Sequence, residues 1–127
     1  MHQDILDSIK KINALDTRHI EADFCFDKDL ALFKGHFPGQ PMLPGVMQIE
    51  MVRVMLEMTR KMPFIISHIK KIKYLKPIFP GDHIKIAMEL SEKNDIMEIS
   101  AIIFVEEDKA GTLKMILSPV QNKGFFP

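Results

Sequence analysis

Residues 34–45, KGHFPGQPMLPG, run directly into residues 46–56, VMQIEMVRVML, and this junction decides the fold. The first stretch holds three glycines and three prolines in twelve residues, which fix its backbone into turns. The final pair, Pro44 and Gly45, suits a helix start, where the first backbone N–H groups have no partner inside the helix. The sequence therefore predicts a constrained loop that delivers the chain to the N-terminus of a long helix.

The helix is expected to span residues 46–62. It is apolar over most of its circumference, so we expect other elements to enclose it. Flexible thioether side chains suit the wall of a site for a long apolar ligand, although core packing explains any one methionine equally well. Six methionines lie in or beside this helix: Met42, Met47, Met51, Met55, Met58 and Met62.

The rest of the chain is dominated by the alternation of apolar and polar residues that is typical of half-buried strands. Residues 4–12 instead have the spacing of a short amphipathic helix. One long helix and about five antiparallel strands predict an α+β fold in which a curved sheet wraps the helix, with edges that a second copy could cover. Strands are expected at residues 18–26, 65–75, 83–90, 96–105 and 112–117, with turns at 77–82, 92–95 and 108–111.

The size and charge of the chain exclude several classes of protein. Its 127 residues predict one domain, 1–127. The 17 basic and 17 acidic residues give a net charge of zero, which argues against nonspecific nucleic-acid binding. The single Cys25 cannot form an internal disulfide. Because the sequence has neither a signal peptide nor an apolar run of ~20 residues, we expect a cytoplasmic protein that does not enter a membrane.

Three residues around the junction carry a possible chemistry. His36 lies in the constrained loop, and a neutral imidazole, with an ordinary pKa near ~6.5, can accept a proton. The Gly45 amide at the helix start can stabilise an oxygen that gains negative charge. Glu50, about 7.5 Å further along the helix, could donate a proton if burial keeps it protonated. Together they would suit removal of a proton next to a carbonyl and loss of water, without a metal or coenzyme.

Simpler interpretations of the same residues remain open. His36 could cap a turn, and Gly45 could be a good helix start without any chemistry. Glu50, Arg53, Glu57 and Lys61 share one helical stripe with alternating charges, which is typical of a solvated ion-pair face. The pattern alone does not decide between an acid and an ion pair for Glu50.

Two motifs resemble the β-hydroxyacyl-acyl-carrier-protein dehydratases, the FabZ/FabA-like enzymes. The first is FKGHFPGQPMLPGV (residues 33–46), with Glu50 fourteen residues after His36. The second is KYLKPIFPGD (residues 73–82). The resemblance implies a hot-dog fold with His36 as the base, Glu50 as the acid and the Gly45 amide as the oxyanion donor. It places Phe37 and Val46, together with Arg53 and Val54, in the substrate-binding part of the site.

The resemblance also implies how the protein works with its partners. The substrate would be a 3-hydroxyacyl chain held on the phosphopantetheine of acyl carrier protein, and the enzyme itself would need no cofactor or metal. The protein would be a homodimer, and possibly a higher oligomer, in which His36 faces Glu50 of the other protomer. Lys70, Lys71, Lys73 and Lys76 would offer a basic surface to the acidic carrier, although ordinary solvated lysines are an equally good explanation.

The sequence departs from the family at the position one turn after the acid. A glutamine is usual there, whereas this chain has Val54, so that Glu50 loses a common hydrogen-bond partner. Arg53 could replace it, but a nearby arginine favours the ionised carboxylate rather than a proton donor. A divergent branch acting on specialised acyl chains such as polyenes would fit this departure. Two alternatives to the dehydratase remain, a hot-dog thioesterase in which Glu50 activates water and a catalytically silent acyl-binding or scaffold subunit.

Overall fold

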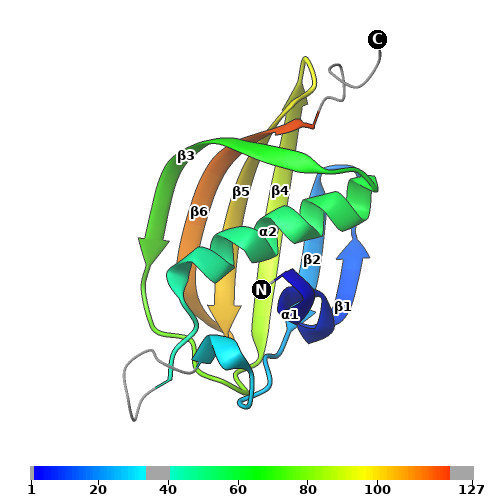
Figure 1. The fold of residues 1–127 in the computed structure, drawn as a ribbon. Helices are drawn as coiled ribbons and strands as arrows, with labels where there is room; N and C mark the ends of the chain where they lie inside the picture. The colour runs from blue at the N-terminus through cyan, green and yellow to red at the C-terminus, as the bar shows by residue number, and fades with distance from the viewer. Residues whose placement is uncertain (1, 34–40, 121–127) are drawn as a thin grey trace.

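The computed structural model describes residues 2–33 and 41–120. A six-stranded antiparallel sheet carries a long helix across one face, as Figure 1 shows. The elements in chain order are α1 (His2–Ser8), β1 (Ile9–Ala14), β2 (His19–Phe24), a 3-10 turn (Ala31–Phe33), α2 (Gly45–Arg60), β3 (Phe64–Tyr74), β4 (Ile84–Lys93), β5 (Ile96–Val105) and β6 (Asp108–Pro119).

The sheet has the strand order β1-β2-β4-β5-β6-β3, and every neighbouring pair is antiparallel. The sheet curves around α2, and α1 lies beside α2 near β1 and β2 (Figure 1). This arrangement confirms the predicted α+β fold with a curved sheet around one long helix. Strands β1 and β2 lie at one end of the sheet, whereas β3 is the edge strand at the other end and pairs with β6. The segment between β2 and β3, which contains α2, therefore crosses the sheet.

Helix α2 forms the centre of the core, as its apolar sequence predicts. It begins at Gly45 after Pro44 and ends at Arg60, where Lys61 takes a left-handed conformation with φ 57° and donates its backbone N–H to the carbonyl of Glu57 at 2.7 Å. Seven of its sixteen residues are buried against the sheet. They are Met47, Gln48, Met51, Val52, Val54, Met55 and Leu56.

The inner face of the sheet is filled by the alternate residues of its strands. Ile84, Ile86, Met88 and Leu90 of β4 point toward α2, and each is at most 2% exposed. Strand β5 repeats this pattern from Met97 to Val105. Burying such side chains stabilises the fold by roughly 1.5–3 kcal/mol each. Because every second residue of these strands must be apolar for this burial, the alternation in the sequence predicted both strands.

The first twelve residues correct the sequence prediction. The expected helix over 4–12 ends at Ser8, and Ile9 begins β1, an edge strand that the sequence did not reveal. Ile9 and Ile12 are half-buried apolar residues three apart, a spacing that suits a helix, whereas their backbone pairs with β2. The Ser8 carbonyl accepts a hydrogen bond from the Cys25 N–H at 2.9 Å, which fixes the switch from helix to strand. The described sheet therefore has six strands rather than about five.

The turn between β5 and β6 also lies earlier than predicted. Glu106 and Glu107 form it, with φ angles of 47° and 73°, while the expected turn residues 108–111 belong to β6. Positive φ at both central positions is the geometry of a two-residue hairpin turn, which usually carries glycine or asparagine. Two glutamates do not indicate such a turn, and the prediction placed it instead at residues 108–111, which include Gly111. Asn94 and Asp95, which also have positive φ, form the turn expected within 92–95.

Candidate active site

The structure describes five of the seven residues that the sequence assigned to the site. They are Gly45, Val46, Glu50, Arg53 and Val54. The other two, His36 and Phe37, lie outside the described residues, so their roles stay predictions.

Gly45 and Val46 form the first turn of α2. Pro44 at the cap position provides no side-chain hydrogen bond to the helix start, and the N–H groups of Gly45 and Val46 make no hydrogen bond that the structure records with a described residue. Val46 itself is 54% exposed. Free backbone donors at the positive end of a sixteen-residue helix suit a carbonyl oxygen that gains negative charge.

Glu50 belongs to an ion-pair cluster on α2. The Arg53 guanidinium donates through Nε to Glu50 Oε2 at 3.0 Å and also through Nη2 to the same oxygen, and its Nη1 donates to Glu57 Oε2 at 3.0 Å. Glu57 Oε2 in turn accepts the backbone N–H of Phe64 at 2.7 Å. The hydrogen bond to Glu50 raises the pKa of Arg53 above its ordinary value. Of the predicted stripe, the pairs Glu50–Arg53 and Arg53–Glu57 are present, whereas no ion pair of Lys61 is recorded among the described residues.

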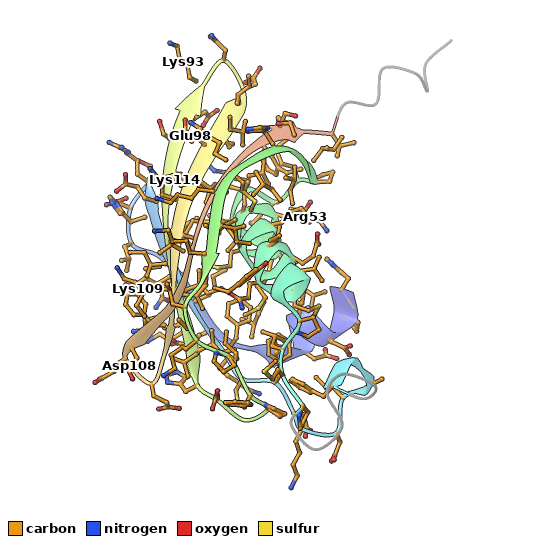
Figure 2. The ribbon with its side chains drawn as sticks, turned by 90° about the vertical axis from the view of Figure 1, so that its left-hand side faces the viewer. Arg53, Lys93, Glu98, Asp108, Lys109 and Lys114 are labelled. Carbon is orange, nitrogen blue, oxygen red and sulfur yellow. The ribbon has the colours of Figure 1, made fainter. Side chains whose placement is uncertain are left out.

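The cluster is neither buried nor fully solvated. The side chains of Glu50, Arg53 and Glu57 are 22%, 25% and 17% exposed. Figure 2 shows Arg53 on the side of α2 that faces away from the sheet. These partly exposed ion pairs lie on the outward face of α2, where a segment from another chain could pack over them.

Val54 follows Glu50 by four residues, one turn of α2, but its side chain is turned into the core. It is 1% exposed and belongs to the hydrophobic core, so the structure does not bring it to Glu50. The valine therefore supplies packing where the family pattern has a polar residue, and Arg53 provides the hydrogen bonds to the acid instead.

A cavity of about 340 Å³ opens at the start of α2. The backbone N–H of Leu43 donates to the carbonyl of Ile78 at 2.8 Å, which holds the approach to the helix against the second motif and forms one wall. Most of the lining is apolar, with a carboxamide and a phenol as its polar side chains besides Lys76. The lining residues are Met42, Leu43, Gly45, Gln48, Tyr74, Leu75, Lys76, Pro77 and Ile78.

Gln48 and Tyr74 were not recognised from the sequence as residues of the site. Gln48 is a polar residue on the buried side of α2, three positions after Gly45. A polar residue at a position where the helical periodicity expects an apolar one is the signal that could have identified it. Tyr74 is the single tyrosine of the chain and ends β3. A Cβ at Gly45 would lie 2.6 Å from Tyr74 Cζ, so the ring packs directly on the bare backbone at the helix start. Partial burial raises the pKa of the Tyr74 hydroxyl, which keeps it protonated at neutral pH.

The four lysines in or beside the second motif divide into two pairs. Lys70 pairs with Glu98 at 3.1 Å and Lys76 with Asp108 at 3.4 Å, so ordinary surface ion pairs account for them. Lys71 and Lys73 are exposed on β3, and Lys71 lies opposite Lys114 of β6 in the register. Figure 2 shows Lys114 and Glu98 on the side of the sheet opposite α2.

The described part of the chain contains no group of three His, Cys, Asp or Glu side chains that could hold a metal ion. None of its helices is long and apolar enough to cross a membrane.

Among solved structures, this fold is similar to the hot-dog proteins. The dehydratase heterocomplex ApeI:P from Xenorhabdus doucetiae has a chain that matches with a TM-score of 0.73 at 24% identity, covering 87% of this chain and 96% of that one. An uncharacterised protein from Erwinia carotovora subsp. atroseptica matches with a TM-score of 0.68 at 27% identity, covering 88% and 93%. These likenesses confirm the predicted hot-dog fold.

Curated relatives are similar in sequence. The 3-hydroxyacyl-[acyl-carrier-protein] dehydratase FabZ of Syntrophobacter fumaroxidans is 29% identical, over 66% of this chain and 63% of that protein. The corresponding enzyme of Geotalea uraniireducens is 31% identical, over 58% of each. The chain thus spans about three fifths of the length of these relatives. The family profile described as ApeI-like, ApeI dehydratase, matches residues 11–111, and the chain belongs to this dehydratase family.

Proposed function

We propose that this protein converts a 3-hydroxyacyl-acyl carrier protein to the trans-2-enoyl form, in the biosynthesis of fatty acids or of related acyl chains such as polyenes. Membership of the ApeI-like dehydratases and the likeness to two FabZ enzymes support the reaction class. The observation that carries the proposal is the start of α2, where Gly45 lines a largely apolar cavity beside the second motif.

The proposed reaction is a β-elimination with three roles. His36 takes a proton from C2 of the acyl thioester, and the electron pair moves toward the carbonyl oxygen. The Gly45 amide stabilises the negative charge that this oxygen gains. Glu50 gives a proton to the 3-hydroxyl group, which leaves as water while the C2–C3 double bond forms. No metal or coenzyme takes part, and the substrate arrives on the phosphopantetheine of the carrier.

We propose that Glu50 serves the site of a second protomer in a homodimer. Glu50 is absent from the described lining of the cavity that holds Gly45 of its own chain. Strand β3 is an edge of the sheet with an unpaired side, and it exposes Ile65 and Ile69, at 53% and 41%. Edge-to-edge pairing of β3 would cover these residues. Further assembly of dimers would then use other surfaces, such as the remaining sheet edge at β1.

The shared site is tested by mixing two inactive variants. His36→Ala and Glu50→Gln should each abolish turnover of a 3-hydroxyacyl carrier substrate. Refolded as an equal mixture, they should recover about a quarter of the parent activity, because half of the dimers are mixed and each of these has one intact site. Parent-level activity in either single variant would refute the assigned roles. No recovery, with mixed dimers shown by native mass spectrometry, would place both residues in one protomer's site.

A thioesterase is the second candidate, and the Glu50–Arg53 ion pair favours it. A cation beside a carboxyl group favours its ionised form, which activates water rather than donating a proton, and Arg53 contacts Glu50 in this way. Mass spectrometry of the product separates the two reactions, because a dehydratase releases enoyl carrier protein and a thioesterase releases free acid. Acyl-chain binding without either product would identify a catalytically silent subunit.

We propose that the acidic carrier binds at Lys71, Lys73 and Lys114. Lys71 and Lys114 are directly opposite each other on β3 and β6, a like-charge pair that costs some stability unless an anionic partner is present. Lys71→Glu together with Lys73→Glu should raise KM for the carrier-bound substrate about tenfold and leave KM for a short pantetheine thioester unchanged. Unchanged KM for both substrates would remove this docking surface. A cytoplasmic location, where carrier proteins meet their enzymes, remains part of the proposal.

A further inference from the structure

Gln48 is a buried polar residue on the core side of α2. Its side chain is 5% exposed, and the only other buried polar residue among those described, Ser8, donates its hydroxyl to the carbonyl of Ile5 at 2.7 Å. The Gln48 carboxamide, in contrast, makes no hydrogen bond that the structure records with a described residue. Among the described residues, Asp23 Oδ1 is the fully enclosed side-chain atom recorded without a hydrogen-bond partner, and no atom of Gln48 is in that state. The Gln48 carboxamide instead borders the cavity at the helix start.

The cavity at the helix start opens onto this carboxamide. Gln48 follows Gly45 by three residues, nearly one turn, so both lie on the same side of α2 and both line the cavity. Tyr74 stands opposite, with its ring against Gly45. A carboxamide-bearing residue and the first residue of the helix therefore line one largely apolar space of about 340 Å³, within the range of small-molecule sites.

Gly111 of β6 leaves space for the carboxamide of Gln48. A Cβ at position 111 would lie 3.2 Å from Gln48 Oε1 and 2.9 Å from the carbonyl oxygen of Lys73. The bare backbone thus lets β6 approach both β3 and the glutamine. A larger residue at position 111 would crowd the carboxamide, so glycine there leaves Gln48 its place beside β6.

We propose that Gln48 contacts the substrate and donates a hydrogen bond to the thioester carbonyl oxygen, as a second donor beside the Gly45 amide. The inference rests on the proposed dehydration and adds a residue to it. When the proton leaves C2, the carbonyl oxygen gains negative charge, and both N–H groups bind it more strongly than they bind the neutral carbonyl. Gln48 gains and loses no proton. A fixed donor in an apolar space adds most to the rate because little reorganisation is needed during the reaction.

The test compares Gln48→Met with Met47→Leu as a matched control. Methionine keeps the length of the side chain but removes the donor, and Met47 is a core residue outside the cavity lining. For Gln48→Met we expect a roughly 100-fold fall in kcat, a KM within about twofold of the parent value and an unchanged or higher melting temperature. The control should keep kcat. A Gln48→Met enzyme with kcat within about threefold of the parent would overturn the inference.

A binding experiment separates this inference from the proposed function. The probe is a 3-hydroxyacyl pantetheine amide, an unreactive analogue of the thioester, titrated into ¹⁵N-labelled protein. The side-chain NH₂ signals of Gln48, assigned by their loss in Gln48→Met, should shift when the analogue binds to the parent protein, and affinity should stay within about twofold in the variant, in line with its KM. If the parent protein shows this shift but no dehydration, the contact stands and the proposed function fails. If the analogue binds without shifting these signals, or does not bind, the contact is overturned whatever the activity.

Discussion

Replacing Gly45 with alanine tests how closely Tyr74 packs on the start of α2. The added Cβ would lie 2.6 Å from Tyr74 Cζ and 2.7 Å from its Oη, closer than carbon and oxygen atoms approach without repulsion. Because the tyrosine is 51% exposed, its ring can turn away in part, so the cost stays near the middle of the 1–3 kcal/mol range for overpacking, about 2 kcal/mol.

The net effect includes a gain from the helix itself. Alanine is favoured over glycine in a helix by up to about 1 kcal/mol, so Gly45→Ala should lower the free energy of unfolding by about 1 kcal/mol and the melting temperature by about 4 °C. In a Tyr74→Ala background the clash is absent, and the same substitution should stabilise the protein by up to about 1 kcal/mol. The two residues should thus show a coupling of about 2 kcal/mol.

Urea denaturation of the parent, both single variants and the double variant measures this coupling. The reasoning is refuted if Gly45→Ala destabilises the protein equally with and without the tyrosine ring, because some other group would then exclude the Cβ. Alanine keeps the backbone N–H, so turnover by the double variant also shows whether position 45 needs glycine for chemistry or only for space.

Three further perturbations have definite expected outcomes. Arg53→Met removes the ion-pair partner of two partly buried glutamates and should lower the free energy of unfolding by about 1–2 kcal/mol, as urea denaturation will show. The Asp16 hydrogen bond raises the pKa of His19 above 6.5, so His19→Asn should destabilise the protein at pH 5.5, with the difference lost as pH rises through the raised pKa; a difference that persists at pH 9 would contradict this. Ile69→Lys on the β3 edge should convert dimers to monomers in sedimentation, whereas Lys11→Glu on the opposite edge should not change the mass.

Alternation and apolar periodicity predicted the central elements because these elements are half buried. In β4 and β5 every second side chain faces α2, so the burial pattern and the sequence pattern coincide. Strand β1 was missed because it is an edge strand with the half-buried Ile9 and Ile12, whose spacing also suits a helix. The turn at Glu106 and Glu107 was missed because a backbone conformation typical of glycine is held there by the pairing of β5 with β6.

The candidate site was predictable only where its residues are close in the sequence. The three- and four-residue spacing of Glu50, Arg53 and Glu57 predicted their ion pairs correctly, because neighbours on a helix surface follow from helix geometry alone. The cavity joins the start of α2 to residues 74–78, and no local pattern reports that contact. Gln48 acquires a possible role only when that cavity is known, since by itself it is one polar residue in an apolar helix.

The two halves of the proposed chemistry lie on different sides of α2. Five residues separate Gly45 from Glu50, and at about 100° per residue this spacing turns the helix through one full turn and a further ~140°. Gly45 therefore lies beside the cavity, while Glu50 lies on the outward side with Arg53. A change of side-chain rotamer does not bring Glu50 around the helix to the Gly45 amide of the same chain. If one site uses both residues, a second chain must bring its own outward helix face to this cavity, and the exposed β3 edge next to the cavity is where it can do so.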